Sequence, residues 1–98
     1  MNPTKEQIQW FWEQCGFKLD DDGDFRWWYL PDGSHLSLDE DPLLDINNLF
    51  KYAVPKLIEK IGRYDLVTLV INAFCDALEA GGEFKDYLFW AIYKALGG

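Results

Sequence analysis

The chain has 98 residues, of which 49% are hydrophobic and 17% aromatic, and its formal net charge is −8. This length predicts a single domain over residues 1–98, with enough apolar area for a core of its own. So high an apolar content excludes a disordered chain. The negative charge argues against binding of nucleic acid or of an anionic membrane.

The chain opens with a helix signal. Thr4 and Gln7 have the spacing of a capping box, and apolar residues then recur at helical spacing as far as Cys15. Gly16 stands where a helix-terminating glycine is expected. The sequence therefore predicts a helix over residues 5–15.

From Phe17 the hydrophobic period changes to two, which is typical of strands. Turn signals DDG at 21–23 and DG at 32–33 divide this stretch into three antiparallel strands. Loops of three and two residues place one set of alternate residues on the inner face: Phe17, Leu19, Phe25, Trp27, Tyr29, Leu36 and Leu38. Trp28 and Leu30 then fall on the opposite face, which is either covered by a second layer or used for binding.

The second half of the sequence is predicted to be helical. Asp45 can cap a helix over 46–61 that bends at Pro55, and the helical period persists from Leu66 to Leu78. A strand also fits the β-branched run 66–71, although the period favours a helix. A last helix is expected over 84–96, with a second apolar face made by Phe89, Trp90 and Tyr93. The predicted fold class is α+β: a three-stranded antiparallel meander packed by about four helices in the order αβββααα, with an αβα sandwich as one arrangement.

The acidic charge is concentrated in one stretch. Between Asp20 and Asp45 lie nine acidic residues and one basic residue, interleaved with the aromatic run at 25–29. Such a segment attracts basic surfaces, and a row of carboxylates can present charge much as a phosphate backbone does. We expect the following residues to bind a basic protein partner: Asp20, Asp21, Asp22, Asp24, Trp28, Asp39, Glu40 and Asp41.

The sequence shows no catalytic motif. A calcium contact could involve Asp20, Asp22 and Asp24, but the EF-hand spacing around Gly23 is wrong, and a solvated turn explains these residues. Zinc ligands and a Cys–His dyad would have to come from Cys15, Cys75 and His35, which are not clustered. We therefore expect a non-enzymatic protein with no metal and no cofactor. Cys15 and Cys75 are expected to be free, inert thiols on apolar helix faces.

Four segments resemble a known family: WEQCGF at 12–17, YLPDG at 29–33, LFKYAVPKL at 49–57 and LFWAIYKAL at 88–96. Together they are similar to small phage and prophage proteins of the ABA-sandwich type. The resemblance implies a phage context and a sheet covered on both faces. It implies no activity and no catalytic residues.

These features together predict a non-enzymatic acidic binding module of phage origin. It would inhibit a host defence protein of the anti-CRISPR or anti-restriction kind by occupying its basic nucleic-acid-binding surface. The alternative is an accessory phage protein that self-assembles, for example as a homodimer, through its aromatic surface. The first residues, MNPT, lack a signal-peptide pattern, so we expect the protein in the host cytoplasm.

Overall fold

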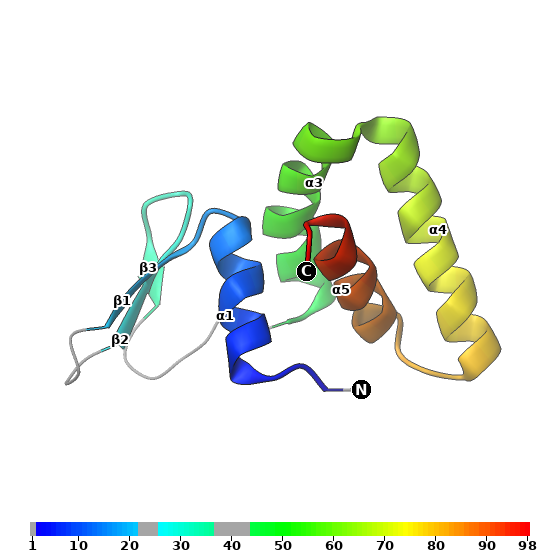
Figure 1. The fold of residues 1–98 in the computed structure, drawn as a ribbon, viewed down its shortest axis with the longest axis horizontal. Coiled ribbons are helices and arrows are strands. Elements are labelled where there is room, and N and C mark those ends of the chain that lie inside the picture. The colour runs from blue at the N-terminus through cyan, green and yellow to red at the C-terminus, as the bar shows by residue number, and fades with distance from the viewer. Residues whose placement is uncertain (1, 22–25, 37–43) are drawn as a thin grey trace. The chain divides into compact units, whose positions relative to one another are not determined.

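The computed structural model describes residues 2–21, 26–36 and 44–98 (Figure 1). Its contacts divide the chain into two compact units, Pro3–Leu43 and Leu44–Gly98 with Met1–Asn2. We call these the hairpin unit and the helical unit and describe each by itself. That the whole chain forms one domain stays a prediction.

Helix α1 (Lys5–Gln14) begins the hairpin unit, as the sequence predicted. The Thr4 hydroxyl accepts from the Gln7 N–H at 3.2 Å, and the Gln7 side chain accepts from the Thr4 N–H at 2.8 Å. This capping box satisfies two backbone donors that a helix start leaves free. Gly16, at φ 95°, takes a left-handed conformation that lets the chain turn from α1 into the first strand.

The sheet is small. Strands β1 (Lys18–Asp21) and β2 (Arg26–Tyr29) have four residues each and form an antiparallel hairpin, to which β3 (His35–Leu36) adds two residues. Helices make up most of the described chain. The predicted fold class is therefore wrong: the fold is mostly helical, with what is essentially a two-stranded sheet, and is not built on a three-stranded meander.

The strand register also differs from the prediction. Leu19 pairs with Trp28, and Trp28 pairs with Leu36. Because side chains alternate between the two faces, these pairs turn each side chain of β2 to the face opposite the predicted one. Trp28 becomes the inner residue of β2, while Trp27 and Tyr29 lie on the other face.

The turn between β2 and β3 explains why the register of these two strands differs from the prediction. The Gly33 N–H donates to the Leu30 carbonyl at 3.0 Å, and the Leu30 N–H donates to the Ser34 carbonyl at 2.8 Å. The loop therefore has three residues, with Pro31 in a position that favours a type I turn and Gly33 at φ 90°. One residue more than the predicted two-residue loop shifts the register by one, which exchanges the faces. In the first hairpin, Asp21 was predicted to begin the turn but is the last residue of β1, where it pairs with Arg26. The other predicted turn residues, 22 and 23, lie outside the described residues.

Three aromatic side chains form the buried centre of the hairpin unit. The Trp12 and Phe17 ring centroids are 4.8 Å apart, and those of Phe17 and Trp28 are 6.3 Å apart in an edge-to-face arrangement. Trp12 is completely buried, and Trp28 is 1% exposed. Packing of Trp28 on Phe17 thus joins the hairpin to the segment that follows α1.

In the helical unit, the chain is helical from α2 (Ile46–Asn48) through a π-helical segment, η1 (Leu49–Ala53), into α3 (Val54–Ile61). The Asp45 carboxylate accepts from the Asn48 N–H at 2.8 Å and caps this start, as predicted. Pro55 has no N–H, so one carbonyl in the preceding turn loses its usual donor. The helical turn just before Pro55 is widened into η1, and the bend predicted at Pro55 itself stays a prediction.

Helices α4 (Arg63–Ala80) and α5 (Phe84–Ala95) complete the helical unit. The helical prediction for 66–78 is confirmed, and its strand alternative is wrong. Gly81, at φ 71°, ends α4, and α4 contacts both α3 and α5 (Figure 1). The Lys60 ammonium donates to the Leu96 carbonyl at 2.9 Å, so a cation from α3 satisfies the C-terminal end of α5. None of the described helices combines the length and hydropathy needed to cross a bilayer.

We expect the two thiols to react at very different rates. Cys15 and Cys75 are both free, as predicted, but Cys15 is completely buried and Cys75 is exposed, which corrects the expectation that both are inert. Ellman titration of the native protein should show one rapid thiol and one that reacts only on unfolding. Cys75→Ser should remove the rapid phase alone; loss of the slow phase instead would contradict these positions.

Candidate protein-interaction surface

The outer face of the hairpin unit gathers one carboxylate, one ammonium and three aromatic rings. The observed register pairs Lys18 with Tyr29, Asp20 with Trp27, and Tyr29 with His35. Residues paired across strands share a face of the sheet, so these five side chains lie on the face opposite Trp28. We call Lys18, Asp20, Trp27, Tyr29 and His35 the acidic–aromatic face.

The rings of this face are in contact with one another. The His35 ring lies 5.7 Å from that of Trp27, edge to face, and 6.3 Å from that of Tyr29. Tyr29 is 44% exposed, His35 is exposed and Trp27 is half-buried. Three touching rings that keep this much solvent contact form an apolar surface with polar edges, which is typical of binding sites.

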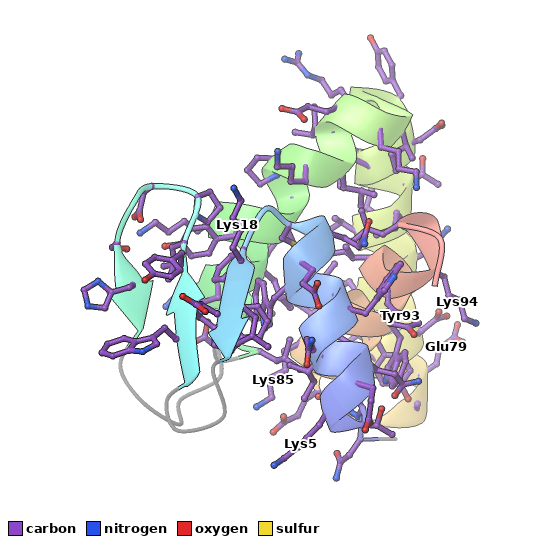
Figure 2. The ribbon with its side chains drawn as sticks, turned by 60° about the vertical axis from the view of Figure 1, so that its left-hand side comes forward. Lys5, Lys18, Glu79, Lys85, Tyr93 and Lys94 are labelled. Carbon is purple, nitrogen blue, oxygen red and sulfur yellow. The ribbon has the colours of Figure 1, made fainter. Side chains whose placement is uncertain are left out.

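Charged side chains border the rings on strand β1. Lys18 and Asp20 are both exposed, and Lys18 extends from β1 in Figure 2. Because β1 is an edge strand of the sheet, charged residues there discourage pairing with a strand of another chain. A partner is therefore expected on the side chains of this face and not along the strand edge.

The predicted partner-binding acids fall partly in strand β1 and partly outside the described residues. β1 ends at Asp21, β2 begins at Arg26, and β3 runs antiparallel to β2 and ends at Leu36, opposite Trp28. The predicted partner-binding residues Asp22, Asp24, Asp39, Glu40 and Asp41 lie outside the described residues. Asp20 and Asp21 are in β1, and Asp20 shares its face with the exposed rings.

Trp28 was predicted to be a partner-binding anchor on the surface. It is 1% exposed and packs on Phe17, so it is a core side chain. The prediction missed Trp27, Tyr29 and His35, because it placed the first two inside. Pro31 was the available signal: at the second position of a turn, it indicates the three-residue loop that turns these rings outward.

We predict that Trp28→Ala lowers the free energy of unfolding by about 3–5 kcal/mol, because it removes a fully buried indole. Trp27→Ala is the matched control, since the same indole is removed from a half-buried site; its cost should be about 1 kcal/mol. Urea unfolding followed by far-ultraviolet circular dichroism measures both. A larger loss for Trp27→Ala would indicate the opposite register.

The aromatic surface predicted on the last helix is largely covered. Phe89 is 2% exposed, and Trp90 and Tyr93 are half-buried and contact it. Trp10 of α1 is also half-buried. Self-assembly through these residues stays a prediction.

A groove of about 670 Å³ lies within the helical unit, between α4 and α5. Asp65, Asn72 and Asp76 line it from α4, and Trp90 and Lys94 line it from α5. Lys94, which lines this groove, is labelled in Figure 2. The described lining contains no Ser, Cys or His, so the groove lacks a nucleophile with a histidine base.

No metal centre is found in the part of the chain that the structure describes, where no three His, Cys, Asp or Glu side chains are close enough to hold an ion. Cys15 is buried and His35 is exposed, so these two do not form a dyad. Comparison of the chain with protein-family models, curated proteins and solved structures found no match.

Proposed function

We propose that this protein is a non-enzymatic acidic binding module whose acidic–aromatic face docks on a basic nucleic-acid-binding surface of another protein. The observation that carries the proposal is the position of Asp20 on the same exposed face as Trp27, Tyr29 and His35. This arrangement places a carboxylate beside apolar contact area, with Lys18 on the same face, in a unit whose net charge is −7. Apolar rings supply contact area, and charge speeds and directs the encounter.

Charge supports a basic partner. The hairpin unit contains ten acidic and three basic residues, so −7 of the net −8 belongs to it. The negative electrostatic field of this unit speeds its encounter with a positively charged surface and repels nucleic acid. The protein would therefore compete with nucleic acid for its partner and would not bind nucleic acid itself.

The chemistry of the face suits side chains that normally hold phosphates. Arginine pairs with carboxylates through the same forked hydrogen bonds that it makes to phosphate. Its guanidinium also stacks on Trp and Tyr rings. A carboxylate beside exposed rings can therefore replace a phosphate and its stacked base in such a site.

We further propose that the partner is a host defence protein, inhibited in the manner of anti-CRISPR or anti-restriction proteins in the host cytoplasm. The support for this narrower statement is the resemblance of four segments to small phage proteins, together with the charge of the hairpin unit. Nucleic-acid-binding host defence proteins are therefore the partners to test.

The charge requirement can be tested with a seven-residue variant: Asp20→Asn, Asp21→Asn, Asp22→Asn, Asp24→Asn, Asp39→Asn, Glu40→Gln and Asp41→Asn. Purified restriction endonucleases and CRISPR effectors are loaded with fluorescent duplex DNA, and the protein is titrated in. We expect the wild type to displace DNA, higher salt to weaken this, and the variant to be at least about tenfold weaker.

The matched control neutralises six exposed acids of the helical unit: Glu59, Asp65, Asp76, Glu79, Glu83 and Asp86. It should displace DNA as well as the wild type does. Equal loss in both variants would mean that only net charge matters, and no loss in the seven-residue variant would contradict the proposal.

The aromatic requirement is tested separately with Tyr29→Ala, which leaves the charge unchanged. Exposed Tyr and Trp side chains at the centre of an interface often contribute 2 kcal/mol or more, so we expect about 30-fold weaker displacement, mainly through faster dissociation. Phe50→Ala, which removes another aromatic ring at a 42% exposed position of the helical unit, is the control. If Phe50→Ala weakens displacement and Tyr29→Ala does not, the docking face is misassigned.

A further inference from the structure

Helix α4 carries a row of apolar side chains that the helical unit leaves exposed. Their exposed fractions are 86% for Tyr64, 50% for Val67, 54% for Ile71, 49% for Phe74 and 66% for Leu78. We call these five residues the α4 stripe. They are separated by three, four, three and four residues and therefore follow one side of the helix for about 20 Å.

The buried residues of α4 lie on a different side. Leu66, Ala73 and Ala77 are the buried positions of the helix, whereas the stripe adjoins them and faces solvent. Phe74 of the stripe contacts the Phe84 ring, with the ring centroids 5.6 Å apart in an edge-to-face arrangement. The apolar part of α4 is thus about twice as wide as the part that its neighbours cover, and such an excess indicates a further interface.

The spacing of the stripe points to a helix as its partner. Alternating intervals of three and four residues form the seam of a pair of helices packed along their length. Charged residues beside such a seam select the partner; here the adjoining residues of the central turns are Thr68, Val70 and Cys75, which are uncharged. The α4 stripe of a second copy has the same spacing and the same uncharged neighbours, so it fits as the partner. A basic partner would find no acidic side chain among these neighbouring residues.

We propose that the α4 stripe is the interface of a homodimer, in which α4 of one protomer packs along α4 of a second copy. Burial of these five side chains, which are 49% to 86% exposed, removes roughly 500 Å² from water on each protomer. Two protomers then bury about 1,000 Å², the lower bound for a specific interface. This proposal concerns the helical unit alone and does not rest on the function proposed for the hairpin unit.

The dimer is tested by sedimentation equilibrium of the full chain, with Ile71→Glu at the centre of the stripe. Ile71 is 54% exposed, so the substitution should leave the monomer folded, but it would place an unpaired carboxylate inside the interface. We expect the wild type to dimerise at micromolar concentration and the variant to have a dissociation constant about a hundredfold higher. Ile58→Glu, at a 43% exposed position on α3, is the matched control and should dimerise like the wild type.

Two further measurements keep the test decisive. Leu78→Glu, at a 66% exposed position, repeats the disruption near the end of the stripe if Ile71→Glu fails to fold. The exposed Cys75 thiol adjoins the stripe, so its rate of alkylation should fall as wild-type concentration rises, but not in Ile71→Glu.

Three results would overturn the proposal. A wild type that stays monomeric at several hundred micromolar has no such dimer, and slow Cys75 alkylation in that monomer would mean that the chain covers the stripe itself. An unchanged dissociation constant in both stripe variants would place a dimer elsewhere. Dissociation by Ile58→Glu alone would assign the interface to α3.

Discussion

The pairing of β1 with β2, which sets Leu19 opposite Trp28, is the constraint on which the hairpin unit depends. Trp28 is the residue of the middle strand that reaches Phe17, and through Phe17 the chain of ring contacts continues to Trp12 in α1. Burial of these rings supplies most of the apolar area that holds so short a sheet in place. Since side chains alternate along a strand, the same pairing also decides that Trp27 and Tyr29 face outward beside Asp20.

The two units present surfaces of different chemistry. The hairpin unit holds −7 of the net charge and exposes rings beside the Asp20 carboxylate, which suits basic side chains. The helical unit is nearly neutral and exposes the α4 stripe, which suits another apolar helix. A dimer formed through the helical unit would carry two acidic–aromatic faces, and two linked sites hold a partner with paired basic surfaces more tightly than one.

Much of the fold could be predicted from local signals. The capping box at Thr4, the Asp45 cap and the glycine after α4 each satisfy or end a helix through neighbouring residues, so each is visible in the sequence. The face of β2 could not be predicted from alternation, because residues 27–30 are apolar on both sides and only loop length decides the register. For the same reason the outward position of Trp27 and Tyr29 was missed. Part of the exposed stripe was visible in the sequence, because Val67 and Ile71 fall outside the face that Leu66, Ala73 and Ala77 define. Phe74 was not, because its spacing places it on the predicted apolar face.

The most direct test of this account is the set of cross-strand nuclear Overhauser effects between backbone protons of β1 and β2. The account predicts contacts that link Leu19 with Trp28 and Asp20 with Trp27. These contacts would place Trp28 inside and the acidic–aromatic face outside. Contacts of Leu19 with Phe25 and of Phe17 with Trp27 would show the opposite register, would turn Trp27 and Tyr29 inward, and would contradict the assignment of the interaction surface.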